Sequence, residues 1–243
     1  MKIVHYGAIS TALVILLGIA MVIPPFIKPA SPLIVLLSFS AINDNNESTW
    51  CSNIASILEK RDVRGAVFFT GRVAEHHPEC VRAFPDTVDI GSQTYHYVSL
   101  ASISDYTYAL EEIQDGKEAV DNAGRLSSKI FKAPYGDTDE NIYSLLNRAN
   151  ILADFSYDNQ FNKYYDGKFI KFKLATYDGT DYSADFFQNL TAKDGPIQIV
   201  FDDKTPPQQV DEFISKLKSR HIKFVSASDL AGIDLTIREI EKA

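Results

Sequence analysis

The sequence has few positive charges. Its 243 residues include 24 Lys and Arg against 32 Asp and Glu, so the formal net charge is −8. Because nucleic-acid binding depends on clustered positive charge, this balance gives a nucleic-acid partner no electrostatic support. The chain also lacks a basic run suited to anionic lipid headgroups. We therefore expect a mildly acidic surface and no nucleic-acid partner.

Cysteine is scarce as well. The two cysteines, Cys51 and Cys80, permit a single disulfide, and two free buried cysteines are an equally ordinary alternative. Asn46 and Asn189 each begin an N-glycosylation acceptor sequence. Each of these features is a weak signal alone. Together with the apolar segment described next, they favour export from the cytoplasm.

A long uncharged run stands at the start of the chain, at residues 7–27. Its length approaches the roughly 20 residues that cross a bilayer, and Lys2 before it suits a cytoplasmic start. No convincing A-x-A cleavage site follows, so we favour a signal anchor that holds the following domain at the cell surface, outside the cytoplasm. A cleaved signal peptide and a buried N-terminal helix are the alternatives.

The rest of the chain contains no internal repeat and no low-complexity tract. Apolar strand patterns alternate with helical patterns from Leu33 onward, which predicts one α/β domain, most simply a barrel. We expect an N-terminal transmembrane or signal segment at 1–28, the barrel at 33–232 and a C-terminal tail at 233–243. Expected strands are 33–39, 65–70, 88–92, 169–175, 197–201 and 224–226; expected helices are 48–60, 73–84, 105–123, 184–190 and 210–219.

The stretch 127–158 organises this domain. It reads as a short strand, a Pro-Tyr-Gly turn, an amphipathic helix capped by Asp137 or Asp139, and a second short strand that ends at Asp158. Such a unit favours parallel pairing and puts the loop 132–136 at the carboxyl end of a strand. In α/β folds, sites are built at that end.

The same stretch resembles a known family. FKAPYGDTDENIYSLL is similar to the F-R-x-P-Y-G segment of the polysaccharide deacetylase family, the NodB-homology domain. AVFFTGRVAEHHPECVRAF and IGSQTYHYVSL resemble two further segments of that family, in the same order and spacing. The resemblance spans roughly residues 33–226. It implies a distorted (β/α) barrel with fewer repeats than the eight-fold barrel.

The resemblance also implies a reaction, the metal-assisted hydrolysis of an amide or ester. In the family, one Asp and two His hold a divalent metal, a second Asp is the base and a late His is the general acid. Here Ser40 matches the base and Ala41 the metal carboxylate; Gln93 and Tyr97 match the two His, and Phe201 the acid. All five are substituted. We therefore predict a pseudo-deacetylase, with no catalytic residue and no metal or other cofactor.

Several residues remain candidates for a ligand groove at the old site. Lys132 replaces the family's Arg beside Tyr135, and Asp158 matches its acidic partner, so we expect a structural Lys132–Asp158 ion pair. Gln93, Tyr97, His96 and Asp202 complete the groove candidates, with His96 most simply a core or rim residue. The chain also supplies aromatic faces for sugar rings, at Tyr95, Tyr97, Tyr106, Tyr108, Tyr135, Tyr157, Tyr164 and Tyr165.

Three functions follow. The first is a module outside the cytoplasm that binds a cell-envelope glycan or a protein partner. The second is an accessory subunit of a membrane complex. The third is an active deacetylase with a relocated Zn²⁺ or other divalent-metal site, built from Asp44, His96 and Asp202.

Overall fold

The computed structural model describes residues 31–43, 47–136, 138–156, 170–171, 174–180, 183–190 and 196–239. The expected membrane segment at residues 7–27 lies outside these ranges. Within them, no helix has both the length and the apolar character needed to cross a bilayer.

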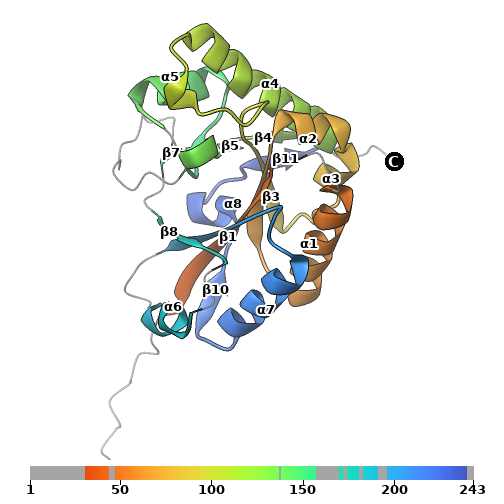
Figure 1. Ribbon diagram of the computed structural model, residues 1–243, viewed down its shortest axis with the longest axis vertical. Helices are drawn as coiled ribbons and strands as arrows, with labels where there is room; N and C mark the ends of the chain where they lie inside the picture. The colour runs from red at the N-terminus through yellow and green to blue at the C-terminus, as the bar shows by residue number, and fades with distance from the viewer. Residues whose placement is uncertain are drawn as a thin grey trace, which may run out of the picture. The chain divides into compact units, whose positions relative to one another are not determined.

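The architecture is a parallel half-barrel, which confirms the expected α/β fold in this form. In the described ranges the main sheet has the order β7-β6-β5-β3-β2-β1-β9-β8, and β10 also pairs with β1 (Figure 1). Its strands are β1 (Leu33–Ala41), β2 (Gly65–Phe69), β3 (Val88–Ser92), β5 (Ile130–Phe131), β6 (Ala153–Asp154), β7 (Ile170–Lys171), β8 (Ala175–Asp178), β9 (Ile197–Asp202) and β10 (Ile222–Phe224).

Strand β1 is central to this sheet. It pairs in parallel with β2, β9 and β10. Eight of its nine residues are buried, which is the pattern of a strand covered on both faces. The apolar run at 33–39 thus predicted the strand correctly, and the structure extends it to Ala41.

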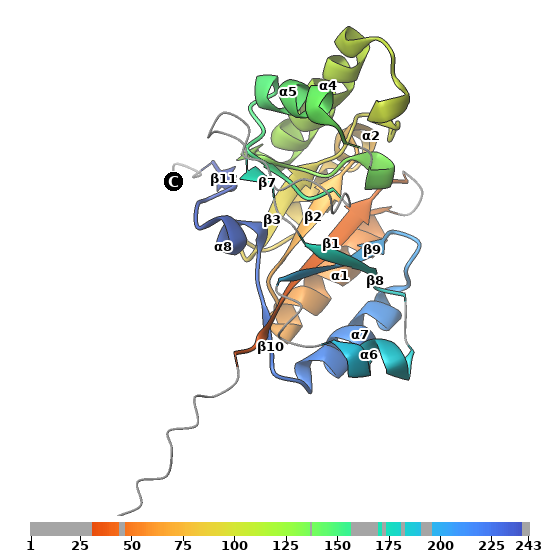
Figure 2. The ribbon, with the colours of Figure 1, turned by 90° about the vertical axis from the view of Figure 1, so that its left-hand side faces the viewer.

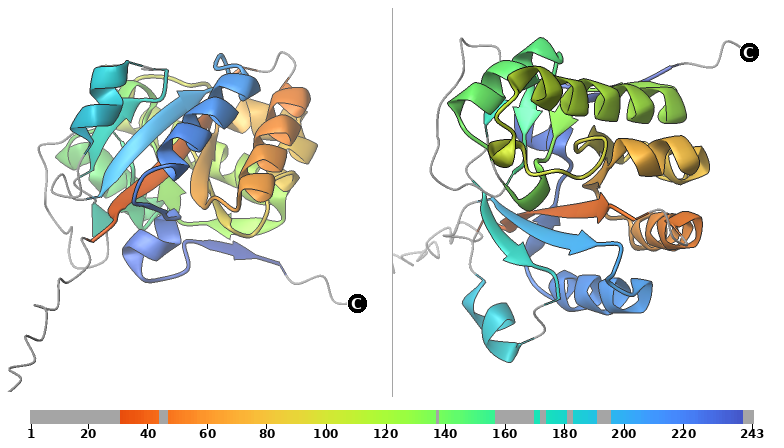
Figure 3. Two further views of the ribbon diagram at one scale, coloured as in Figure 1. Left: turned by 90° about the horizontal axis from the view of Figure 1, so that it is seen from below. Right: turned by 45° about the horizontal axis from the view of Figure 1, so that its top comes forward.

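Helices cover the outer face of the sheet. The right-hand view of Figure 3 shows α4, α2 with α3, α1 and α7 side by side along that face. The helices of the described residues are α1 (Glu47–Arg61), α2 (Gly71–His76), α3 (Pro78–Arg82), α4 (Tyr106–Gly124), α5 (Glu140–Arg148), α6 (Ala184–Asn189), α7 (Pro207–Lys218) and α8 (Ala227–Ala231), with short 3₁₀ turns η1 (Leu100–Ser102) and η2 (Pro134–Gly136).

Two expected elements were wrong. The helix predicted at 73–84 is two helices, α2 and α3, because His77 leaves the helical conformation and Pro78 begins a new helix. The strand predicted at 169–175 is instead the short β7 and the separate β8, on opposite ends of the described sheet order. The alternating pattern of apolar and polar residues that predicted one strand therefore covers parts of two strands.

The Pro-Tyr-Gly unit has the expected order of strand, turn, helix and strand, but its second strand, β6, ends at Asp154 and not at Asp158. Asp139 caps α5 by accepting a hydrogen bond from the backbone N–H of Ile142, at 2.8 Å.

The segment expected to be a C-terminal tail contains a strand, because β11 (Thr236–Arg238) pairs antiparallel with β4 (Leu126–Ser128).

A disulfide joins α1 to α3. Cys51 and Cys80 are bonded to each other and both are fully buried, which confirms the disulfide alternative over two free thiols. The loop that it closes spans 29 residues of sequence. Helices α6 and α7 lie side by side in Figure 2, and the rings of Phe186 and Phe187 on α6 pack against Phe213 on α7.

The two faces of the sheet have separate cores. The outer cluster includes Phe39, Ala41 and Phe201 and packs against the helices. The inner cluster includes Leu36, Phe68 and other side chains that fill the concave side of the half-barrel. Because successive side chains of a strand alternate between faces, β1 and β2 contribute to both clusters.

Candidate functional site

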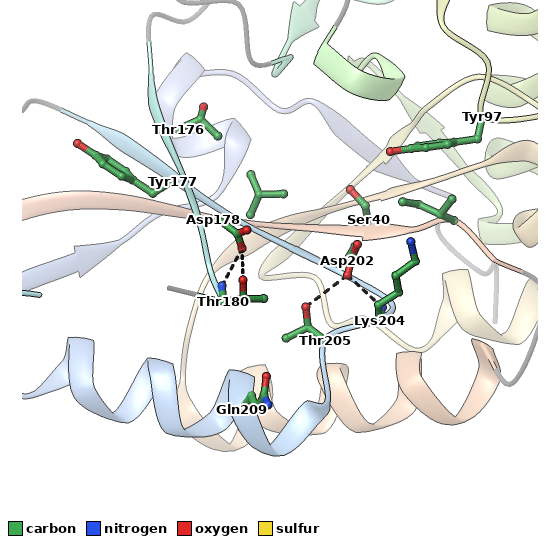
Figure 4. A pocket seen from close by; sticks show the side chains of 12 residues that line it. Ser40, Tyr97, Thr176, Tyr177, Asp178, Thr180, Asp202, Lys204, Thr205 and Gln209 are labelled. Carbon is green, nitrogen blue, oxygen red and sulfur yellow. Dashed lines mark hydrogen bonds between the residues drawn. The ribbon is translucent and has the colours of Figure 1, made fainter. Parts of the chain in front are cut away.

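A pocket opens where β1, β8 and β9 end. Its volume is about 710 Å³, and it is lined by polar and aromatic side chains (Figure 4). Strands β8 and β9 pair in parallel, as do β9 and β1, so their carboxyl ends meet at one edge. Its lining residues are Ser40, Ile42, Tyr97, Thr176, Tyr177, Asp178, Thr180, Val200, Asp202, Lys204, Thr205 and Gln209. This is the edge at which α/β folds build their sites.

At the end of β1, the side chains on the two faces of the sheet differ in polarity. Ser38 and Ser40 lie on the inner face, and Ser40 reaches the pocket. Ala41 belongs to the outer core and is fully buried there. Of the pair that the resemblance matches to the family's two aspartates, only Ser40 thus faces the pocket.

Lys132 is the group that meets Ser40. It follows β5 and extends its amine across the inner face, where Nζ donates hydrogen bonds to Ser40 Oγ and, at 3.3 Å, to Ser38 Oγ. The side chain is 2% exposed, and Nζ lies 5.0 Å from the centre of the Phe68 ring. Burial lowers the pKa of the Lys132 ammonium from 10.5 to about 7, against the opposing attraction of Asp202.

At the end of β9, the inward residue is Asp202. In the parallel register Asp202 is opposite Ser40, and Phe201 is opposite Phe39. The Phe201 ring stacks on Phe39 at 5.4 Å and meets Phe213 of α7 at 5.4 Å, so it belongs to the outer core. Phe201, which the resemblance matches to the family's acid, therefore lies outside the pocket, whereas the groove candidate Asp202 lines it, because a one-residue step changes the face of a strand.

The acidic pair after β9 shapes the rim. Asp202 Oδ1 accepts from the backbone N–H of Lys204 at 3.1 Å. Asp203 Oδ2 accepts from the backbone N–H groups of Ile42 and Asn43, each at 2.6 Å. The two carboxylates thus hold the loops that follow β9 and β1 at the edge of the pocket.

Tyr97 and Tyr135 form an aromatic pair at this rim. Their ring centres are 5.2 Å apart, and Tyr135 is 63% exposed. Both have a positive φ, near 60°, which is uncommon for a bulky side chain. The other described non-glycine residues with positive φ are Asp62, Arg125 and Asn150, which terminate helices. Backbone strain away from helix ends is concentrated at functional sites.

Tyr97 remains a neutral phenol at physiological pH. Burial raises the pKa of its hydroxyl to about 12, and the neighbouring Tyr135 and the carboxylates of Asp202 and Asp203 add to this shift. In Figure 4 the hydroxyl of Tyr97 is directed to the same part of the pocket as that of Ser40. A neutral phenol is a hydrogen-bond donor at this position.

Gln93 and His96 lie apart from the main pocket. Gln93 is 1% exposed, and its Nε2 donates to the Phe68 carbonyl at 3.1 Å. His96 lines a smaller pocket of about 360 Å³ that shares Tyr97 and Tyr135. Its Nδ1 lies 2.7 Å from Oε1 of the buried Glu112, which also accepts from the His96 backbone N–H. His96 is therefore a rim residue held by α4.

Sequence reasoning missed the β8 side of the pocket. Asp178 faces it from β8 and accepts hydrogen bonds from Thr180 at 2.8 and 2.7 Å, whereas the ring of Tyr177 packs on Phe186 in the outer core. The signal was present in the run Ala175–Asp178. It was obscured because the expected strand ended at 175, before this Tyr-Asp pair.

Other candidate residues are placed elsewhere or lie outside the described ranges. Tyr106 and Tyr108 are exposed on α4, and Tyr95 donates a hydrogen bond to Glu75. Asn189 is exposed at the end of α6. The residues outside the described ranges are Asp44, Asn46, Tyr157, Asp158, Tyr164 and Tyr165.

The described residues do not fit the metal that the resemblance implies. The methyl group of Ala41 is buried in the outer core. The amide nitrogen of Gln93 donates a hydrogen bond to the backbone carbonyl of Phe68. The Lys132 amine lies against Ser40 on the inner face, and its ammonium form would repel a divalent cation. Over the described ranges, no group of three or more His, Cys, Asp or Glu is arranged to hold a metal ion.

Comparison with known proteins agrees with this fold. A family model described as polysaccharide deacetylase matches residues 28–153, just over half of the chain. The chain belongs to this polysaccharide deacetylase family. Among curated proteins, none matches it significantly.

Solved structures of this family are similar in fold. A family 4 carbohydrate esterase from Streptomyces lividans, in complex with acetate, has 17% identity and a TM-score of 0.57, over 87% of this chain and 93% of that one. The peptidoglycan deacetylase PdaC from Bacillus subtilis has 16% identity and a TM-score of 0.61, over 85% and 93%. The wild-type CE4-family pseudoenzyme BA3943 from Bacillus anthracis has 17% identity and a TM-score of 0.61, over 84% and 66%.

Proposed function

We propose that this polysaccharide deacetylase-family domain has lost the family's metal-dependent reaction and binds a cell-envelope glycan in the pocket at the ends of β1, β8 and β9. The observation that carries the proposal is the lining of that pocket. Tyr97 supplies an aromatic face, and Asp178, Asp202 and Gln209 supply hydrogen-bonding groups around it. Sugar rings need both kinds of contact.

The loss of the metal reaction is supported by the same inner face. The deacetylase mechanism requires a cation at the end of β1, whereas this chain places the Lys132 amine beside Ser40 there. The solved relatives include both peptidoglycan deacetylases and a pseudoenzyme. The family therefore contains members with and without the reaction, and we place this chain with the latter.

Titration of a uniformly ¹⁵N-labelled sample with N-acetylglucosamine oligomers tests the glycan site. We expect chemical-shift changes at Tyr97, Thr176 and Asp178, with an affinity that falls about tenfold or more in the Tyr97→Ala variant because a stacking face is lost. Tyr106→Ala is the matched control, since Tyr106 is 50% exposed on α4 and does not line the pocket. Equal losses in both variants, or shifts confined to other surfaces, would contradict the glycan site.

We also propose that the domain lies outside the cytoplasm and that residues 7–27 anchor it in the membrane. The Cys51–Cys80 disulfide supports this location, because disulfides persist in oxidising compartments. Protease digestion of intact cells is the test. We expect cleavage of the domain without lysis, and protection of the whole domain until lysis would contradict the location.

A further inference from the structure

Ser40 and Lys132 form a hydroxyl–amine pair that glycan binding does not use. The Lys132 amine donates to Ser40 Oγ, and Ser38 Oγ, 3.3 Å from the same Nζ, helps to fix it. Lys132 is buried beneath the floor, whereas Ser40 lines the pocket. A buried amine behind a hydroxyl that reaches a pocket is the arrangement of a serine nucleophile with a lysine base.

We propose that Ser40 is a nucleophile, with Lys132 as its base, that takes an acyl group from a neutral ester bound in this pocket. The activity goes beyond the proposed glycan binding. It uses the same pocket but requires neither a metal ion nor a particular sugar.

The environment of Lys132 suits a base. Its amine lies over the Phe68 ring and away from water, and this burial brings its pKa to about 7, so a large fraction is neutral at physiological pH. In the described ranges, the titratable side chains on the elements around it are Asp202 on β9, Asp154 on β6 and Tyr97 after β3. Asp202 opposes the shift, Tyr97 stays neutral, and Asp154 accepts from Ser156.

The proposed step conserves atoms and charge. Neutral Lys132 Nζ takes the proton of the Ser40 hydroxyl as Oγ forms a bond to the acyl carbon. The bond from that carbon to the ester oxygen then breaks, and the leaving alcohol takes the proton back from Nζ. Water then attacks the acyl-serine, and Nζ takes a proton from this water. The bond from the acyl carbon to Oγ breaks and Oγ takes the proton from Nζ, which releases the carboxylic acid and restores Ser40.

Two further observations favour an ester that carries no charge. The pocket lining carries two carboxylates, Asp178 and Asp202, against the one ammonium of Lys204, and this excess of negative charge disfavours an anionic substrate. Tyr97 directs a neutral phenol toward the same region as the Ser40 hydroxyl, where it can donate to the oxyanion that develops on the acyl carbonyl (Figure 4). An ester also provides a better leaving group than an amide in a site without a metal.

The test is covalent labelling of the full chain in detergent with a neutral alkyl fluorophosphonate, followed by mass spectrometry. We expect a single adduct on Ser40 that is absent in Ser40→Ala and unchanged in Ser52→Ala, whose serine is exposed on α1. Lys132→Met is expected to slow labelling by about 10²- to 10⁴-fold, the usual contribution of a general base.

The pH profile of the unmodified protein tests the base without any variant. We expect the labelling rate to rise about tenfold per pH unit below about pH 7 and to level off above it, since one proton must leave Lys132. A merely structural Lys132 would not produce this profile. No adduct between pH 6 and 9, or an adduct that survives in Ser40→Ala, would overturn the proposal. Either result would leave the proposed glycan binding to be decided separately, by the titration with Tyr97→Ala.

Discussion

The two faces of β1 differ in chemistry: one is apolar and the other is polar. On the outer face, Phe39 and Ala41 are fully buried against helices. On the inner face, Ser38 and Ser40 meet the amine of Lys132. Adjacent residues of β1 thus lie in different surroundings: Ala41 is in an apolar core, and Ser40 is in a buried polar contact with Lys132.

The outer-face residues of β1 stabilise the fold, whereas the inner-face residues contribute polar groups at the pocket. Apolar burial on the outer face stabilises the sheet against α1 and α7, and it does not depend on what the pocket binds. The inner face can exchange carboxylates for hydroxyls and an amine while the outer face keeps the strands in place. A family fold is thus compatible with the absence of the family's site.

The largest expected effect comes from placing a carboxylate on each face in turn. Ala41→Asp puts a charge in the apolar core with no cation to pair it, and we expect it to lower the free energy of unfolding by about 5 kcal/mol. Ser40→Asp places the same group beside the Lys132 amine, where an ion pair forms, and we expect a change of about 1 kcal/mol or less. Urea denaturation measures both. Similar decreases in the free energy of unfolding in the two variants would contradict the proposed difference between the two faces of β1.

A smaller effect is expected from neighbouring residues of β9. Phe201→Ala removes a ring that packs on Phe39 and Phe213, which should cost about 3–5 kcal/mol of unfolding free energy. Asp202→Asn keeps the shape of the inward side chain and should cost about 1 kcal/mol or less. If Asp202→Asn proved the more destabilising of the two, the assignment of Phe201 to the outer core would be wrong.

The pH dependence of stability sharpens the account of the inner face. The pKa of Lys132 is about 7 in the folded chain and 10.5 as the ordinary value, so between these pH values the unfolded chain binds one proton more. Stability should therefore rise with pH in this window, by up to about 1.4 kcal/mol per unit, and should not change through this group below pH 7. Lys132→Met removes this contribution. Parallel unfolding curves for both proteins between pH 7 and 10 would show that the amine is not buried.

Much of the fold follows from patterns in the sequence. The apolar run at 33–39 predicted a buried strand, and Asp139 was one of two expected caps for α5. These features are local, because burial and capping depend on residues that are close in the chain. The break at His77 was missed because one Pro inside a helical pattern was not given enough weight.

The site was harder to predict because it depends on strand register and on contacts between distant residues. Phe201 was matched to the family's acid, and the register puts it in the outer core; Asp202, already a groove candidate, is the residue of β9 that lines the pocket. Lys132 was expected to pair with Asp158, which lies outside the described residues, and its contact with Ser40 joins positions 92 residues apart. Asp178 was missed because its strand was predicted at the wrong residues.

The central claim is that this pocket binds a glycan without a metal ion. Calorimetric titration of the full chain with an N-acetylglucosamine oligomer, once in EDTA and once in excess Zn²⁺, tests it most directly. We predict the same Kd in both, because Lys132 and Ala41 leave no metal site at the end of β1. Binding that disappears in EDTA and returns with Zn²⁺ would contradict it.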